Sequence, residues 1–369
     1  MKKNLKKGMA VLMAAAMMAL FSTACSGTKE ATEVPSKEQK EAEKERPEGS
    51  GQEEEKSGNT DLGEKIVIRY SHVQSTASPT HQAAEFLKQY LEEKSNGQVT
   101  MEIFPAGQLY NDATEIDALV GGNVDMISTY MSKLTSVDTA MQYCLAPYLF
   151  DSPEQMLAFY SDEKTKELLY GSLERAGIEV IDCFFGGSQY FMSNGKAMNS
   201  AADFKGMKVR EGGGKMCEAL YSALGASVTT VAYNDLYTAM QTKLVDVAVI
   251  SVDGATGIKL QETLKNVSSF KHQYAPYLIM FNQETFSSYP EDVQQLIREG
   301  IAEARKYQLE KVYEVSEEGL TEIKQACDFH EATEEEIEEL KSIWLPVVEE
   351  YVSPEWLDAI NSFKATYTE

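Results

Sequence analysis

Apolar and polar positions in the first part of the chain follow a helical period and a strand period in turn. A proline at one helix start and Asn-Gly or Gly-Gly pairs at helix ends support the boundaries. The predicted elements are strand 66–70, helix 79–95, strand 99–103, helix 112–120 and strand 124–128. This β-α-β-α-β order predicts a parallel sheet covered by helices.

The same order is predicted again further along. The elements are strand 207–210, a helix between the glycines at 212–214 and Gly225, strand 227–231, helix 235–242 and the apolar strand 245–250. The two units also end alike, with GNVDMIS at 122–128 and LVDVAVIS at 244–251. Two similar α/β lobes with a cleft between them are therefore expected.

The remaining segments connect these units. A helix is predicted at 162–176, followed by a strand at 178–185, and the chain is expected to cross to the second lobe near 186–187. A further strand is predicted at 277–281. The apolar spacing from Pro290 toward Ile323 predicts a long helix, and about 30 helical residues would extend about 45 Å, enough to brace both lobes. One or two amphipathic helices are predicted within 331–351.

The beginning of the chain has the features of an export signal. Four early lysines precede an apolar core at 9–21, which is too short to span a bilayer comfortably. The sequence STAC at 22–25 is similar to a bacterial lipobox, so lipidation of Cys25 is predicted, with ordinary secretory cleavage after Ala24 as the alternative. Residues 26–61 are rich in Glu, Lys, Ser, Gly and Pro and are expected to form a disordered tether.

Composition narrows the classes of function. The 369-residue chain has a formal net charge of -24, which argues against nucleic-acid binding. It also makes an arginine in a cleft more telling, because an acidic protein must bind anions through local positive charge. Four cysteines beyond Cys25 show no CxxC spacing and are predicted to be free thiols. Neither a metal site nor a cofactor is predicted, since the four histidines form no HExxH pattern.

Candidate ligand-binding residues lie where predicted strands end. Ligands of parallel sheets bind outside the carboxyl ends of the strands, and Arg210 ends the first strand of the second unit, facing a helix N-terminus. His72, Tyr130 and Tyr233 follow other strands and are expected to pack over the ligand body. For each of these three, a purely structural role is the alternative.

With these residues laid out, the chain resembles the solute-binding proteins of tripartite ATP-independent periplasmic (TRAP) transporters. The resemblance rests on EKSNG at 93–97, FPAGQL at 104–109, PYLF at 147–150, DFKGMKVR at 203–210, LGA at 224–226 and YTAMQT at 237–242. It implies the two-lobed periplasmic-binding-protein fold, with each lobe a sheet flanked by helices, joined by crossing strands and a long bracing helix. The expected organisation is a signal peptide at 1–24, a lipid-anchored linker at 25–63, a first lobe of 64–187 with 273–313, and a second lobe of 188–272 with 314–369.

The resemblance also implies roles for single residues. The family arginine that clamps a ligand carboxylate corresponds to Arg210, whose planar fork can bind a carboxylate through two hydrogen bonds. A second family arginine is replaced by Gln189, and a polar contact after the third strand is replaced by Ile250. These departures favour a monocarboxylate with an apolar or aromatic body over a dicarboxylate.

The predicted function is capture of a small organic acid by lobe closure and its delivery to a TRAP permease. The protein is expected to be a monomer outside the cytoplasm, anchored to the membrane through Cys25. A sensory module that presents its ligand to a receptor is one alternative. An enzyme on the same scaffold is another, although the chain has no GxSxG motif and His72 is the one cleft histidine proposed.

Overall fold

The computed structural model describes residues 65–368. The predicted signal peptide, the lipidation site Cys25 and the whole of the predicted linker lie outside these residues. The described part is a mixed α/β structure with a central sheet flanked by helices, as predicted. No helix within it is long and apolar enough to cross a membrane.

The first β-α-β-α-β unit forms where the sequence predicts it. Its elements are β1 (Ile66–His72), α1 (Pro79–Lys94), β2 (Val99–Phe104), α2 (Glu115–Val120) and β3 (Met126–Tyr130). The strands are parallel in the order β2-β1-β3. Ser78 caps α1 by accepting a hydrogen bond from the His81 amide, and the apolar stripe of the helix is buried on the sheet.

The second unit repeats this order with shorter strands. Its elements are β5 (Lys208–Arg210), α5 (Lys215–Ala223), β6 (Ser227–Val228), η4 (Tyr233–Asp235), α6 (Leu236–Gln241) and β7 (Val247–Ser251). The strands are parallel in the order β7-β5-β6, and every residue of β7 is buried. The predicted strand 227–231 is thus too long, because the chain leaves the sheet after Val228 and turns toward η4.

One strand belongs to both halves of the sheet. β4 (Ile178–Ser193) pairs antiparallel with β9 (Tyr274–Asn282) as far as Ser188, and with β7 from Gln189 onward. A register shift lies between Phe185 and Ser188, where the strand changes partner. The main path of the sheet is β2-β1-β3-β9-β4-β7-β5-β6. The sequence did not predict β8 (Asn266–Ser269), which pairs with β4, or β10 (Asp328–Glu331), which pairs with β8.

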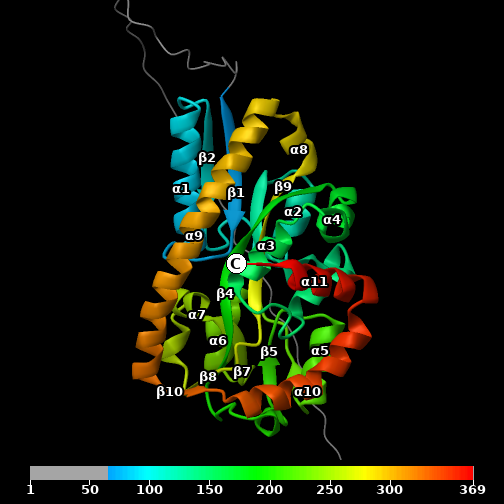
Figure 1. Ribbon diagram of the computed structural model, residues 1–369. Coiled ribbons are helices and arrows are strands. Elements are labelled where there is room, and N and C mark those ends of the chain that lie inside the picture. Colours follow the sequence, from blue (N-terminus) through cyan, green and yellow to red (C-terminus); the bar gives the residue numbers. More distant parts are fainter. Residues whose placement is uncertain (1–64, 369) are drawn as a thin grey trace, which may run out of the picture. The chain divides into compact units, whose positions relative to one another are not determined.

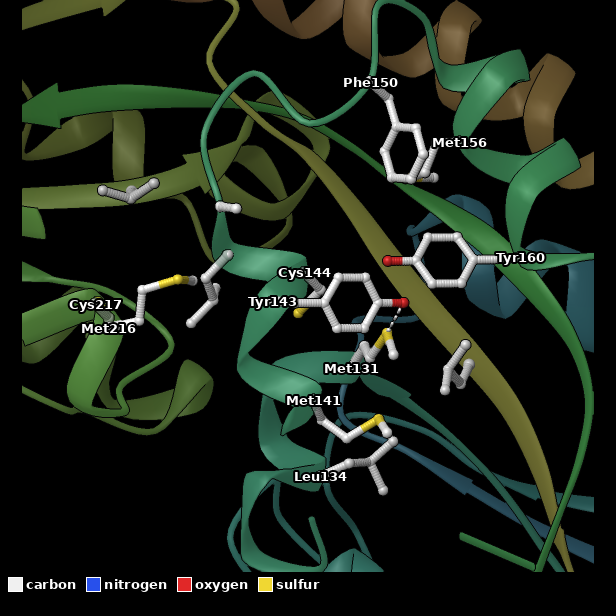
Figure 2. Packing of buried hydrophobic residues seen from close by; sticks show 14 of the residues in the cluster. Met131, Leu134, Met141, Tyr143, Cys144, Phe150, Met156, Tyr160, Met216 and Cys217 are labelled. Atoms are coloured by element: carbon white, nitrogen blue, oxygen red, sulfur yellow. Dashed lines mark hydrogen bonds between the residues drawn. The ribbon is translucent and has the colours of Figure 1, made fainter. Parts of the chain in front are cut away.

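Between β3 and β4 the chain forms four short helices. They are the 3-10 helices η1 (Met131–Ser136) and η2 (Thr139–Leu145), then α3 (Pro153–Tyr160) and α4 (Lys166–Arg175). Figure 2 shows Tyr143 of η2 pointing toward Met131 and Tyr160, with Met216 and Cys217 of α5 near the same segment. The Tyr143 hydroxyl lies 3.7 Å from the Met131 sulfur. One continuous apolar cluster therefore connects this segment with the second unit.

A long helix packs on both units. α9 (Glu291–Ala326) has 36 residues and contacts α1 of the first unit and α7 (Val252–Gly257), which follows the second. Figure 1 shows it running past both helices. The other late elements are η3 (Ala201–Phe204), η5 (Leu260–Glu262), α8 (Gln283–Ser288), α10 (Glu334–Tyr351) and α11 (Pro354–Thr366).

Candidate ligand-binding site

A cavity of about 50 Å³ lies where the strand ends of the two units meet. Its lining comes from the residues that follow β1, β3, β5 and β7, and from the crossing strands β4 and β9. Both units place the carboxyl ends of parallel strands here, as expected for an open α/β sheet. A cavity of this size holds a few water molecules or a small organic group.

Arg210, the last residue of β5, lies in this cavity and is only 9% exposed. Its Nε donates to the carbonyl oxygen of Val231 at 3.1 Å, which fixes the orientation of the guanidinium. Within residues 65–368, neither terminal nitrogen bonds to a protein acceptor, and no carboxylate lies within the 4.0 Å that would define an ion pair. A nearly buried arginine is normally paired, so this side chain has free bonding capacity for an anion.

Tyrosines form an aromatic wall of the cavity. Tyr130, at the end of β3, stacks on Tyr277 of β9 with ring centroids 5.7 Å apart. Gly186 of β4 makes room for this pair, because a Cβ at this position would lie 2.3 Å from Cδ2 of Tyr277. The Tyr277 hydroxyl accepts a hydrogen bond from Gln74, and the Tyr233 hydroxyl donates to the carbonyl of Gly254.

The cavity also contains three carboxyl groups. Asp112 forms an ion pair with Lys133 at 3.0 Å, and both side chains are largely buried. Glu211 follows Arg210, and burial raises the pKa of its carboxyl to about 7. Burial also raises the pKa of Asp253, which follows β7. Arg210 is therefore the one cation lining the cavity that has no carboxylate partner in the described chain.

The structure brings five of the six predicted ligand-binding residues to this cavity: Arg210, Gln189, Tyr130, Tyr233 and Ile250. Their contact with a ligand stays a prediction. The Gln189 side chain donates to the carbonyl of Gly187 at 3.3 Å.

The placement of His72 in the cleft was wrong. Its Nε2 lies 3.2 Å from Nδ1 of His81, on α1, and burial lowers the pKa of His72 to about 3. Successive side chains of a strand point to opposite faces. His72 therefore points to the helix layer, and the following residue, Val73, lines the cavity instead.

Sequence reasoning missed Gln74, Asp112, Lys133, Glu211, Asp253 and Tyr277 as cavity residues. Glu211 and Asp253 could have been found, because they stand one and three residues after predicted strand ends. Lys133 lies in the 3-10 helix η1 and Asp112 just before α2, and nothing in the sequence pairs them.

The described residues contain no cluster of three His, Cys, Asp or Glu side chains that could hold a metal ion. Cys144, Cys183 and Cys217 are buried free thiols, and Cys327 is a partly buried one. Burial raises the pKa of the three buried thiols well above the usual value, so they are held in the protonated form.

Comparisons with known proteins agree with this geometry. Residues 70–354 match the model of "Bacterial extracellular solute-binding protein, family 7". The C4-dicarboxylate-binding periplasmic protein of Rhodobacter capsulatus is 30% identical over 311 residues, which are 84% of this chain and 93% of that protein. The 2,3-diketo-L-gulonate-binding periplasmic protein of Escherichia coli is 25% identical, over 70% of this chain and 79% of its own length.

Two solved structures show the same fold. The TRAP periplasmic solute-binding protein of Shewanella oneidensis with bound succinate has a TM-score of 0.76 at 23% identity, covering 81% of this chain and 99% of its own. The protein of Anaerococcus prevotii with bound glucuronate has a TM-score of 0.77 at 21% identity, covering 83% and 100%. The cavity described above is thus part of a fold that holds acids in these two proteins.

Proposed function

The chain belongs to family 7 of the bacterial extracellular solute-binding proteins, and from this we propose that Arg210 binds the carboxylate of its solute. The protein captures a substrate for a TRAP permease. The observation that carries the assignment to Arg210 is its free guanidinium fork, held in the cavity by the bond to Val231. Such a fork binds a carboxylate through charge-assisted hydrogen bonds, which are about twice as strong as neutral ones.

The lobes proposed from the sequence, 64–187 with 273–313 and 188–272 with 314–369, give the capture step its mechanism. The change of β4 from β9 to β7 between Ser188 and Gln189 supports the first boundary. Tyr130 and Tyr277 line the cavity from one side of that boundary, and Arg210 and Tyr233 from the other. A ligand that contacts both sides stabilises the closed form by its greater affinity for that form.

The test is to compare Arg210→Ala with the unaltered protein by isothermal titration calorimetry. A thermal-shift screen of organic acids, with mass spectrometry of copurified compounds, would first supply the ligand. Loss of one partner of a desolvated charge pair costs roughly 2–5 kcal/mol, or about 30-fold to several thousand-fold in affinity. Arg210→Lys keeps the charge without the fork and should fall between the two. An unchanged affinity in Arg210→Ala, with the variant folded, would refute the assignment.

We also propose that the preferred solute has one carboxylate. Lys133, the other cation of the cavity, is already neutralised by Asp112, and Ile250 presents an apolar wall. Titrating acids of one carbon skeleton with one or two carboxylates checks this proposal. Tighter binding of the dicarboxylates would contradict it.

The family indicates that the protein acts outside the cytoplasm, since the relatives are periplasmic solute-binding proteins. We propose further that Cys25 is lipidated and anchors the chain to the membrane. The STAC sequence followed by an acidic linker supports this proposal. Fractionation should find the unaltered protein with the membrane and Cys25→Ala in the soluble fraction. Equal partitioning of both would contradict the proposal.

A further inference from the structure

Two carboxyl oxygens in the cavity have no donor, and the Tyr130 hydroxyl there has no partner either among residues 65–368. Glu211 is only 4% exposed, and one of its carboxyl oxygens accepts from the Gly212 amide at 3.0 Å. Its other oxygen, Oε2, is buried without a hydrogen-bond partner among residues 65–368, and so is Oδ1 of Asp253. A buried polar atom that stays unsatisfied destabilises a protein, so these oxygens need a bonding partner from outside the chain.

The other charges of the cavity leave this need unmet. Lys133 is bound to Asp112, and the Nε of Arg210 is bound to the Val231 carbonyl. Glu211 adjoins Arg210 in sequence, yet no ion pair joins the two side chains. The cavity thus presents one free cationic fork together with two free carboxyl acceptors. A ligand that fits it has an acceptor group for the fork and a donor group for the carboxyl oxygens.

Tyr277 lies close enough to both kinds of charge to respond to each. Burial raises the pKa of its phenol, Asp253 raises it further, and Arg210 opposes the rise. Tyr233 responds to the same two side chains in the same directions. The two tyrosines line the same cavity as Arg210 and Asp253.

We propose that the solute carries a hydrogen-bond donor, an ammonium or a hydroxyl group, in addition to its carboxylate, and that Asp253 and Glu211 accept from this donor. The inference rests on the proposed role of Arg210. It assigns Asp253 and Glu211 as specificity-determining residues. An unsubstituted acid would leave both acceptors unpaired, and sites built for a donor reject analogues that lack it.

Titration calorimetry on the full chain with matched acids tests the proposal. Each set of acids shares one skeleton of three to five carbons, with a hydrogen, a hydroxyl or an ammonium group placed at each position along it. At one position, a donor-bearing acid should bind at least tenfold more tightly than the unsubstituted acid. That preference should fall at least tenfold in Asp253→Ala or in Glu211→Ala, because each removes an acceptor, whereas Asn or Gln would keep a carbonyl oxygen. Glu115→Ala, which removes a buried carboxyl outside the cavity lining, serves as the matched control and should leave the preference intact.

The pattern of loss separates the two donors. An ammonium ligand should lose its advantage in Asp253→Asn, because the charge is gone, whereas a hydroxyl ligand should keep most of it there and lose it in Asp253→Ala. Either result supports the proposal. Equal binding of substituted and unsubstituted acids at every position would overturn it, and so would a preference that survives in both folded alanine variants, Asp253→Ala and Glu211→Ala. Failure of the Arg210 assignment looks different. Every acid would then bind Arg210→Ala as tightly as it binds the unaltered protein.

Discussion

The two β-α-β-α-β units share one topology but bring different chemistry to the cavity between them. After the first strand, the first unit supplies Val73 and Gln74, whereas the second supplies Arg210 and Glu211. After the third strand, the first unit supplies a lysine already neutralised by an ion pair, whereas the second supplies the unpartnered Asp253. Free charge is therefore concentrated in the second unit and neutralised charge on the first, whereas each unit contributes a tyrosine, Tyr130 from the first and Tyr233 from the second.

This difference shows which part of the fold determines where the binding cavity lies and which part determines the solute that it binds. The sheet order brings the strand ends of both units to one place, whatever residues stand there. The one to three residues after each strand then decide what is recognised. A change of solute within such a scaffold needs substitutions only at these positions, with the strands and helices left intact.

The largest expected effect on stability concerns Lys133. It also tests whether the first unit contributes a charge to ligand binding. Removing one partner of a buried ion pair leaves an uncompensated charge, so Lys133→Ala should lower the free energy of unfolding by roughly 3–5 kcal/mol. Its effect on solute affinity should be smaller than that of Arg210→Ala. Urea unfolding and titration calorimetry give the two quantities.

The double variant Lys133→Ala with Asp112→Ala should recover most of the lost stability, because no charge is then left alone. If Lys133→Ala were as stable as the unaltered protein but bound its solute as poorly as Arg210→Ala, the contrast between the units would be wrong.

How far the sequence could predict this arrangement depends on whether a residue lies in a periodic element. Arg210 ends a strand that the pattern locates, so its position in the cavity could be predicted. His72 also ends a strand, but the side to which a strand residue points depends on a register of one residue, and the prediction took the wrong side. Lys133 lies in a 3-10 helix whose packing involves the distant α5, and no local pattern encodes such a contact.

A second prediction compares two buried histidines by their response to acid. His72 is the last residue of β1 in the first unit, and His272 stacks on Phe191 of β4 with ring centroids 4.4 Å apart. Burial lowers the pKa of each to about 3, below the value of about 6.5 in an unfolded chain. The unfolded state therefore takes up the proton first. The stabilising contribution of each neutral ring is complete above pH 6.5 and is lost as the pH falls toward 3.

At pH 5 each histidine should have reduced the free energy of unfolding by about 2 kcal/mol relative to pH 7. His72→Phe and His272→Phe remove this titration while retaining a ring, so each should make the stability less dependent on pH. Urea unfolding at pH 5 and pH 7 measures the change. Two variants with the same pH dependence as the unaltered protein would show that neither ring titrates abnormally.

The smallest expected effect compares the two contacts of α9. Alanine in place of glycine stabilises a helix by about 1 kcal/mol, whereas overpacking costs about 1–3 kcal/mol, so the neighbour decides the sign. A Cβ at Gly319 would lie 2.7 Å from Cγ1 of Val252, a stiff β-branched side chain. One at Gly300 would lie 2.8 Å from Cδ1 of Leu87, the far end of a flexible side chain, and 2.9 Å from Cδ1 of Tyr90, a half-buried ring with room to shift. Gly319→Ala should therefore lower the free energy of unfolding by about 1 kcal/mol, and Gly300→Ala should leave it within about 0.5 kcal/mol. Urea unfolding of the two variants is the measurement, and the reverse order would mean that α9 is held more rigidly against the first unit than against the second.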